Sequence, residues 1–352
     1  MFAQIEYPVK LLPDELDHYL ARGWFRMRQA VFTTNFLHFN NCFYSAIWLR
    51  VSLDNYQQDK KLVVLNKNFT TEIKACAPAL VQQAHENLFQ HYRQGIAFEV
   101  SATLQELLYG SDPYNRFNTW EVNVYDGATL IAAGFFDLGN NSAAGITCIY
   151  HPAYRKYSLG KYLMQLKMAY CKDRQLQYFY PGYAVPGYQP FDYKLALAKN
   201  HLQYLRLATG QWQYLLTGTP MDIPLNHMVQ QLIVLQLLLG ESNLSNSLLY
   251  YRFFEANLDP YYYSAALFDF PVFIQCNIKI DHEIFLLVVY DLGKQAYQLF
   301  ACSSVIHIGF RQDSVPVFDA DLLRVDYLLY SAAAAKGMVE YLASRYPGII
   351  QA

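Results

Sequence analysis

The chain has 352 residues, of which 53% are hydrophobic and 16% are charged, and its formal net charge is −2. This composition disfavours disorder, and the length suffices for two or three domains. The net charge disfavours non-specific DNA binding, because proteins that bind nucleic acid without sequence preference are basic.

The cysteines and the apolar segments bear on where the protein works. The six cysteines are scattered and form no CxxC pair, which predicts neither a disulfide framework nor a metal site. Reduced thiols indicate a cytoplasmic protein. The first ten residues lack the features of a signal peptide. The most apolar helix candidate, Met228–Leu239, is too short to cross a membrane, so no membrane partner is expected.

Residues 1–105 are expected to form an N-terminal region of mixed structure. Apolar periodicity predicts two strands and three helices here, and each is bounded by polar residues or glycine. The predicted elements are a helix at Asp14–Arg22, strands at Ala30–Phe36 and Tyr44–Leu53, and helices at Ala77–Gly95 and Thr103–Tyr109.

Residues 106–218 are predicted to be a second region, with three strands, one helix and a fourth strand. The Asp126-Gly127 pair between two alternating runs is a strong hairpin signal. A meander that leads into one helix and a further strand predicts a mixed α/β layer, and this order is typical of acyl-transfer folds. The elements are strands at Trp120–Tyr125, Thr129–Leu138 and Ala144–Tyr150, a helix at Ser158–Asp173, and a strand at Tyr178–Tyr183.

Residues 219–352 are predicted to form a C-terminal α+β extension of unknown role. Helices are expected at its start and end, with antiparallel strands between them. The elements are a helix at Asn226–Leu239, strands at Pro271–Ile280, Glu283–Asp291 and Ala296–Ser303, and a helix at Val325–Arg345.

The helix at 158–173 is the first candidate for a functional element. Its apolar residues recur at helical spacing, which predicts one face buried against a sheet. Ser158 can cap its start. Gly160 in the first turn either lets an anionic ligand approach the backbone N–H groups or permits close packing on the sheet. Residues 150–200 carry a local charge of +6, from eight Lys/Arg against two Asp, which suits an anionic donor or a solvated helix face.

Several motifs, in this order and spacing, resemble the arginyl-tRNA–protein transferase family, over residues 14–215. They are ARGWFRM at 21–27, NCFYSAIWLR at 41–50, DKKLVVLNKNF at 59–69, the stretch from 130 to 167, and the aromatic YFYPGY and FDYK segments. The resemblance implies a GNAT-like, mainly antiparallel mixed sheet with flanking helices, so that the α/β (α+β) fold class follows from it. It also implies a donor that is an aminoacyl-tRNA acceptor end and an acceptor that is a protein N-terminus.

The resemblance also implies roles for individual residues. Asp137 or Asp192 would orient the incoming amine, and Tyr193 or the donor's own 2′-hydroxyl would serve the leaving oxygen. The tRNA end would be held by Ser158, Leu159, Gly160, Lys161, Tyr180, Gly182, Tyr183 and Lys194, with the two tyrosines at 180 and 183 stacked on the adenine. An acceptor that begins with Asp or Glu would meet Trp24, Arg26, Lys60 and Lys61.

Three functions therefore stay open. The first is transfer of an amino acid from tRNA to protein N-termini without a further cofactor, with arginine expected as the donated residue and leucine left open. The second is N-acetylation with acetyl-CoA as co-substrate, although residues 155–161 lack the first glycine of the usual CoA loop. The third is a non-catalytic binding protein, because His151-Pro152-Ala153 and Tyr188–Phe191 depart from the family's pattern.

Overall fold

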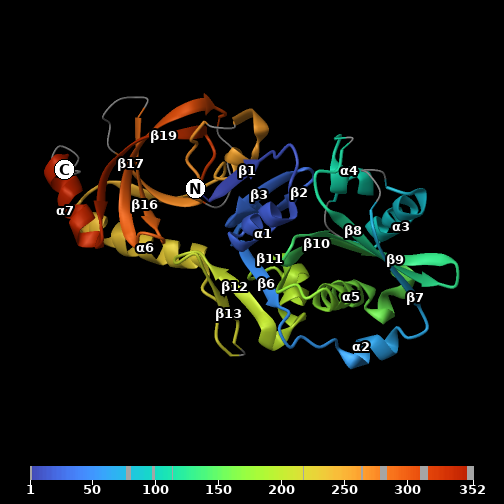
Figure 1. Cartoon of the computed structure of the whole chain (residues 1–352). Helices are drawn as coiled ribbons and strands as arrows, with labels where there is room; N and C mark the ends of the chain where they lie inside the picture. Colours follow the sequence, from blue (N-terminus) through green and yellow to red (C-terminus); the bar gives the residue numbers. More distant parts are fainter. Residues whose placement is uncertain are drawn as a thin grey trace.

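An eight-stranded mixed sheet forms the centre of the protein in the computed structural model (Figure 1). The structure describes residues 2–76, 81–96, 100–112, 114–216, 218–262, 265–277, 284–309 and 316–346. In spatial order the strands are β13 (Gln211–Tyr214), β12 (Leu202–Arg206), β6 (Ile47–Ser52), β11 (Tyr178–Ala184), β10 (Ser142–Tyr150), β9 (Thr129–Leu138), β8 (Thr119–Asp126) and β7 (Thr70–Ala75).

Neighbouring strands of this sheet run antiparallel except β10 and β11, which are parallel. Parallel neighbours require a crossover connection, and here it consists of the 3₁₀ segment η1 (Pro152–Tyr157) and the helix α5 (Leu159–Asp173). The predicted fold class, a mainly antiparallel mixed sheet with flanking helices, is confirmed.

Helices cover both faces of the central sheet (Figure 1). α5 packs on β8, β9 and β10, and α2 (Lys60–Leu65) lies beyond it on the same side. On the opposite face, α3 (Gln83–Gln94) packs on β9 and β10, and α4 (Leu104–Tyr109) packs beside α3. Each face has its own apolar core, with Leu163 and Phe179 in the first and Phe89 and Phe135 in the second.

The N-terminal residues build a small layer beside the central sheet. It contains the helix α1 (Pro13–Ala21), a three-stranded sheet and a hairpin. The sheet is β1 (Ala3–Glu6), β3 (Ala30–Thr34) and β2 (Phe25–Met27), and the hairpin is β4 (Phe36–Phe39) with β5 (Cys42–Ser45). β6 and β7 also precede residue 105, so the central sheet takes strands from both sides of the predicted boundary there. The division into regions 1–105, 106–218 and 219–352 stays a prediction.

A second large sheet, of six strands, follows in the C-terminal part. α6 (Pro224–Glu241) packs on β14, β15 and β16, and α7 (Ala335–Arg345) packs on α6 and β19. The strand order is β18 (Val317–Phe318), β14 (Asn246–Tyr251), β15 (Val272–Cys276), β16 (Ile284–Asp291), β17 (Ala296–His307) and β19 (Asp321–Ala332). Three short 3₁₀ segments complete the connections: η3 (Lys199–His201), η4 (Ala256–Leu258) and η5 (Pro260–Tyr262). None of the helices in the described parts of the chain is long and apolar enough to cross a membrane.

The prediction of a single helix over Val325–Arg345 is wrong in its first half. Residues up to Ala332 belong to β19, which pairs along its length with β17, and the helix begins only at Ala335. The run VDYLLY is rich in β-branched and aromatic residues, which favour strands. Because the backbone groups of β17 can pair with it, this run forms a strand rather than a helix.

Other differences are small. The predicted strands at Ala30–Phe36 and Tyr44–Leu53 are each interrupted, at Asn35 and at Ala46. Helix α3 occupies the second part of the segment predicted at Ala77–Gly95, and residues 77–80 lie outside the described part. The residues between the predicted strands Pro271–Ile280 and Glu283–Asp291 also lie outside it.

The parallel pairing of β10 and β11 is short, and this creates the most unusual part of the fold. Register partners run only from Ser142↔Tyr178 to Ala144↔Tyr180. Beyond them β10 has a register irregularity between Gly145 and Thr147, and β11 has one between Phe179 and Gly182. Such irregularities break the hydrogen-bond ladder and bend strands. We call the region where the two strands stop pairing the splay.

A buried lysine occupies the irregularity in β10. Lys167 comes from α5 and is 0% exposed. Its Nζ donates to the carbonyl oxygens of Phe135 and Thr147 at 2.9 and 2.8 Å and contacts Cys148 Sγ at 3.3 Å. Gly134 leaves room for it, since a Cβ there would lie 2.7 Å from Lys167 Cε. The ammonium thus binds backbone carbonyls where the ladder is irregular.

Replacing Lys167 with methionine should destabilise the protein although it removes a buried charge. The two carbonyls would lose a donor, and each buried unsatisfied group costs about 1–3 kcal/mol. We expect Lys167→Met to lower the free energy of unfolding by roughly 2 kcal/mol or more, measured by urea denaturation. Lys336→Met on α7, where the side chain is 84% exposed, is the control. Equal urea midpoints for Lys167→Met and wild type would contradict this account of the splay.

Candidate functional site

Lys194 lies buried at the splay, on the 3₁₀ segment η2 (Gln189–Ala196) that follows β11. It is 9% exposed, and its Nζ donates to the carbonyl oxygen of Tyr183 at 2.9 Å. The rings of Tyr183 and Phe191 lie 5.4 and 4.7 Å from the ammonium. Burial lowers the pKa of Lys194 to about 7, and Cys148 on β10 opposes this. The side chain therefore lies between the two diverging strands.

Gly182 borders this ammonium closely. Its φ of +87° is a conformation that side chains disfavour. A Cβ at this position would lie 3.3 Å from Lys194 Nζ. A glycine in β11 thus allows the backbone conformation and keeps the space beside the lysine free of a side chain.

Cys148 on β10 and four side chains within electrostatic range of it lie around the splay, and we call these five the splay cluster. The other four are Tyr92 on α3, Lys167 on α5, and Tyr193 and Lys194 on η2. Cys148 is close enough to the other four to act on the pKa of each of them. The cluster therefore joins residues that are up to 102 positions apart in the sequence.

The two tyrosines of the splay cluster are hydrogen-bond donors at neutral pH. Burial raises the pKa of Tyr92 to about 12, and burial also raises the pKa of Tyr193. Tyr193 nevertheless keeps 41% of its surface exposed. A protonated phenol that is partly open to solvent can donate to a developing negative charge on an oxygen.

The start of α5 differs in detail from its prediction. Ser158 has a left-handed φ of +51° and its side chain makes no capping hydrogen bond. Leu159 is buried in the core under α5, whereas Ser158 and Lys161 are exposed. A Cβ on Gly160 would meet Tyr150 at an ordinary 3.6 Å, so packing does not require glycine there. Binding of a tRNA end by these backbone N–H groups stays a prediction.

The aromatic strand does not present both tyrosines for base stacking. Tyr180 is buried and meets Trp212 edge-on at 5.6 Å. Tyr183 stacks on Phe191 at 5.6 Å with an angle of 11° and meets Trp48 edge-on. Stacking of adenine on Tyr180 is therefore not compatible with its burial, and Tyr183 already has a stacked partner on one face.

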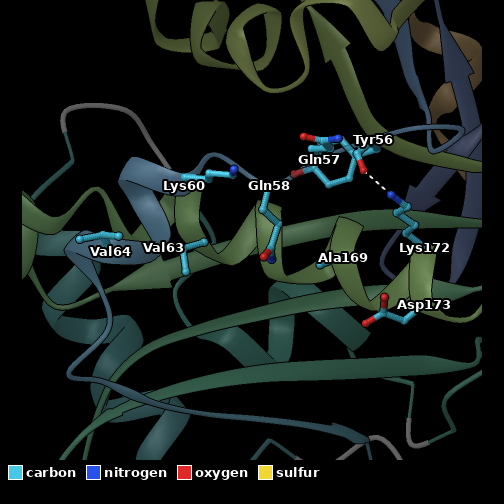
Figure 2. Close-up of a pocket in the computed structure, with 9 residues that line it drawn as sticks. All are labelled: Tyr56, Gln57, Gln58, Lys60, Val63, Val64, Ala169, Lys172 and Asp173. Atoms are coloured by element: carbon cyan, nitrogen blue, oxygen red, sulfur yellow. Dashed lines mark hydrogen bonds between the residues drawn. The ribbon is translucent and has the colours of Figure 1, made fainter.

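Lys60 and Lys61 belong to a different surface. They begin α2, where the Asp59 carboxylate accepts from the backbone N–H of Lys61. Both are exposed on the α5 side of the sheet. Lys60 lines a groove of about 610 Å³ between the 56–64 segment and α5, together with Lys172 and Asp173 (Figure 2). The structure thus does not place this basic pair in the splay cluster, and acceptor binding by it stays a prediction.

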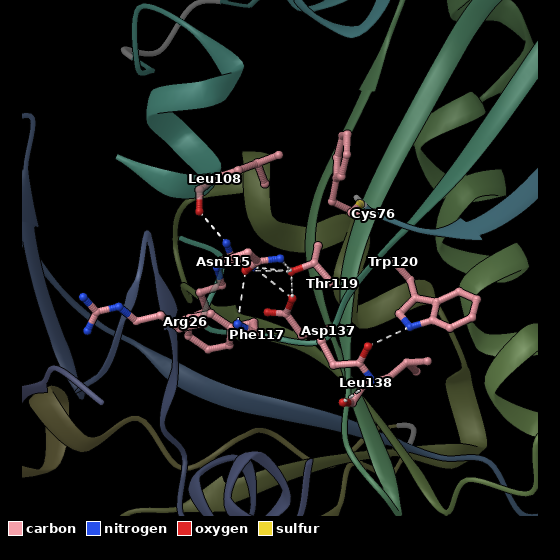
Figure 3. A network of polar contacts seen from close by, with 12 residues as sticks. Arg26, Cys76, Leu108, Asn115, Phe117, Thr119, Trp120, Asp137 and Leu138 are labelled. Atoms are coloured by element: carbon pink, nitrogen blue, oxygen red, sulfur yellow. Dashed lines mark hydrogen bonds and ion pairs between the residues drawn. The ribbon is translucent and has the colours of Figure 1, made fainter. Parts of the chain in front are cut away.

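Arg26 and Asp137 form a buried ion pair on the α3–α4 side of the sheet (Figure 3). Arg26 donates from Nη1 to Asp137 at 2.9 Å and to Thr119 at 2.8 Å, and from Nη2 to the Leu108 carbonyl oxygen. Thr119 also donates to Asp137 at 2.7 Å. Burial raises the pKa of Asp137, and the Arg26 guanidinium opposes this rise.

This pair corrects two predicted roles. Asp137 is 0% exposed and Arg26 is almost as buried, so neither reaches a substrate in this structure. A carboxylate enclosed by its own guanidinium partner holds β9 and β8 to β2 and α4, rather than orienting an amine. Trp24 is likewise buried, against Tyr19 in the core under α1, and is no open acceptor surface. Asp192 lies exposed on η2.

The sequence prediction included Tyr193 and Lys194 but missed Tyr92, Cys148 and Lys167. A signal for Lys167 was present, since it lies four residues after the buried Leu163 and hence on the apolar face of α5. A lysine at such a position is buried with partners or marks a function. Tyr92 and Cys148 carry no comparable sequence signal.

Comparisons with known proteins point to one family. Residues 75–204 match the family model described as "Arginine-tRNA-protein transferase, C terminus". This segment of the chain belongs to that family. It contains β8 to β11, α3, α5 and η2, and so all four elements that contribute to the splay cluster.

Curated relatives of the family agree. The chain is 26% identical over 206 residues to an aspartate/glutamate leucyltransferase of Leptospira interrogans, covering 54% of this chain and 76% of the relative. It is 24% identical over 208 residues to a protein of the same name from Campylobacter jejuni, covering 57% and 85%. Members of this family are aminoacyltransferases.

Solved structures give weaker likenesses. L-PGS from Bacillus licheniformis aligns with a TM-score of 0.29 and 12% identity, over 51% of this chain and 52% of that one. A GCN5-related N-acetyltransferase from Kribbella flavida aligns with a TM-score of 0.25 and 12% identity, over 41% and 49%. The chain thus spans about half the length of these solved proteins.

Lys194→Met should change how the stability of the protein depends on pH. The folded pKa of about 7 lies below the ordinary value of 10.5. Between these values the unfolded state binds more protons, so wild-type stability rises with pH. Tyr183 and Phe191 lie against Lys194, and Cys148 acts on its pKa. We expect Lys194→Met to be more stable than wild type at about pH 6 and to lose this advantage by about pH 10 in urea titrations. A lower stability of Lys194→Met at pH 6 would show that the ammonium is structural, as expected for Lys167.

Asp137→Asn tests the corrected role of Asp137. Removing one partner of a buried pair leaves the Arg26 charge uncompensated and costs about 3–5 kcal/mol. We expect the free energy of unfolding to fall by about that amount in chemical denaturation. Glu340→Gln, in an exposed pair with Lys336, should change nothing measurable. The opposite result would be an Asp137→Asn variant that keeps wild-type stability but loses enzymatic activity. That result would show that this carboxylate is catalytic.

Proposed function

We propose that this protein transfers an aminoacyl group from a charged tRNA to the N-terminal α-amine of proteins. The observation that carries the proposal is the family match over residues 75–204, because this segment holds the strands and the helix that form the splay. The buried, polar character of the splay cluster supports a chemical role for the same place, since perturbed titratable groups gather at functional sites.

The reaction forms an amide bond and breaks an ester. The acceptor's α-amine attacks the ester carbonyl carbon, a C–N bond forms, the bond to the ribose oxygen breaks, and the proton lost by the amine is balanced by one gained by that oxygen. An α-amine has a pKa near 8, so a substantial fraction is already nucleophilic at neutral pH. Alignment then supplies much of the rate, and the protonated, partly exposed Tyr193 is the donor we assign to the departing ribose oxygen.

The donated residue we propose is leucine, rather than the arginine expected from the sequence. The relatives in Leptospira and Campylobacter are named leucyltransferases. Electrostatics favours the same choice, because the splay cluster contains two buried lysines, and of these only Lys167 has a carboxylate, that of Asp137, within electrostatic range. An arginine side chain in that surrounding would meet charges of its own sign at low dielectric, whereas an apolar leucine would not.

The acceptor we propose is a protein that begins with Asp or Glu, as the relatives' names state for them. Acetyl-CoA as an alternative donor has no observation in its favour here, since the backbone at the start of α5 takes a left-handed turn at Ser158 without the glycine of a CoA loop.

The transfer assay tests donor and acceptor together. Purified full-length protein is mixed with leucyl-tRNA or arginyl-tRNA and peptides beginning with Asp, Glu or Ala, and products are identified by mass spectrometry. We expect the Asp and Glu peptides to gain one leucine residue, with a rate at least about tenfold above that with arginyl-tRNA or the Ala peptide. Acetyl-CoA without tRNA should give no product. Folded protein that transfers nothing from either charged tRNA would overturn the proposal.

A further inference from the structure

Exposed cations gather on the side of the central sheet that α5 and α2 cover (Figure 1). Residues 54–67 and 152–174 hold eight exposed Lys or Arg side chains and three exposed Asp, although the whole chain has a net charge of −2. We call the surface of these two segments the basic face. Its central cations are Lys60 and Lys61 on α2, Arg155 and Lys156 on η1, and Lys161 and Lys172 on α5.

The positive charge of the basic face is not neutralised by neighbouring carboxylates. Several exposed cations elsewhere are paired, as Lys74 is with Glu72 at 3.0 Å. Among the described residues, no ion pair joins a cation of the basic face to a carboxylate. The carboxylate of Asp59 instead accepts from the backbone N–H of Lys61 at 2.9 Å. A surface of one sign attracts ligands of the opposite charge, so the basic face suits an anionic partner.

α2 is fixed against α5, so the two helices form one preformed surface. The backbone N–H of Asp59 donates to Gln165 Oε1 on α5 at 3.2 Å. At the other end of α2, Asn66 Nδ2 donates to the Tyr157 carbonyl oxygen at 3.3 Å. The ring of Phe69 meets that of Tyr157 edge-on at 5.0 Å. Because the cations sit on elements that are already ordered, binding costs little conformational entropy of the backbone.

The groove between the two helices also contains an unused hydrogen-bond donor. Figure 2 shows Lys60 from α2 and Lys172 from α5 on its two sides. Tyr56 lines the same groove and is 3% exposed, and its hydroxyl has no hydrogen-bond partner among the described residues. Burial raises the pKa of Tyr56, so the hydroxyl keeps its proton at neutral pH. The groove thus offers ammonium and hydroxyl donors, which phosphate oxygens accept well.

The cations on α5 form a row that leads to the splay. Since β10 and β11 are parallel, α5 between them runs the opposite way and begins at the end of the sheet where these strands diverge. Lys161 and Lys172 are three helical turns apart, and hence lie on one side of α5 with about 16 Å between them. Such a row is longer than one carboxylate can neutralise, but it matches successive phosphates of a nucleic-acid backbone.

We propose that the basic face binds the phosphate backbone of the tRNA acceptor arm and thereby places the charged 3′ end at the splay. The inference rests on the proposed function and names the surface that holds its donor. Lys60 and Lys61 then act on the donor, in contrast to the acceptor binding expected from the sequence. The acidic first residue of an acceptor brings a single side-chain carboxylate, whereas an RNA backbone brings one charge for each nucleotide. These cations are positioning residues, since they hold the donor away from the reacting atoms.

Binding of uncharged tRNA tests the basic face directly. The variant Lys60→Gln/Lys161→Gln is compared with Lys294→Gln/Lys336→Gln, which changes the net charge equally at side chains that are 62% and 84% exposed in the C-terminal part. Fluorescence anisotropy of labelled tRNA is measured from about 50 to 200 mM KCl. We expect the first variant to bind roughly tenfold more weakly at low salt and to reduce the slope of log affinity against log salt by about 2. The control should behave as wild type.

Transfer kinetics add a readout that a purely structural role would not change. For Lys60→Gln/Lys161→Gln we expect the KM for leucyl-tRNA to rise roughly tenfold, while kcat and the KM for the Asp peptide stay within about twofold of wild type. The urea midpoint should match that of wild type, because both side chains are exposed and surface substitutions of this kind change stability little.

Several results would overturn the role of the basic face. One is a tRNA affinity and salt slope equal to those of wild type, and another is an equal loss in the control variant. A raised KM for the peptide with unchanged tRNA affinity would return Lys60 to the acceptor side. Loss of binding to phosphatidylglycerol vesicles with unchanged tRNA affinity would make the face a lipid-binding surface. A wild type that binds tRNA through this face and transfers nothing would overturn the proposed function alone.

Discussion

The short parallel pairing between β10 and β11 is the constraint on which the rest of the site depends. Three register positions hold the strands together before both become irregular. Strand divergence of this kind exposes backbone carbonyls and needs a partner for them. Lys167 is that partner on β10, while on β11 the Tyr183 carbonyl accepts from Lys194. The divergence thus explains why two lysines are buried where the sheet opens.

Three buried cations in the described part of the protein differ in their partners. Arg26 and Asp137 compensate each other between β2, β8 and α4. The Lys167 ammonium contacts two carbonyl oxygens and the Cys148 sulfur. Lys194 has neither an opposite charge nor a full set of acceptors, and a glycine borders it.

The C-terminal sheet lies outside the segment that matches the family model. It nevertheless shares a core with the N-terminal hairpin, since Phe36 is buried in the same cluster as Met228 and Phe254. Phe43 of the hairpin stacks on Tyr250 of β14. Through the hairpin this sheet also approaches η2, because Phe39 and Tyr44 both contact Tyr188. Its packing therefore supports the aromatic loop from which Lys194 extends.

The sequence by itself determined the local elements and the family. Alternating runs, the Asp126-Gly127 turn and the apolar face of α5 predict the central strands and helix, because these depend on periodicity and local turn chemistry. Motif order predicts Tyr193 and Lys194 as site residues. Only the tertiary structure decided which polar residues are enclosed. In the tertiary structure Asp137 and Arg26 form a buried ion pair, and Tyr180 is buried against Trp212. The first half of the predicted C-terminal helix is instead the strand β19, which pairs with β17. Burial and pairing depend on which distant segments meet, and a local pattern carries no information about that.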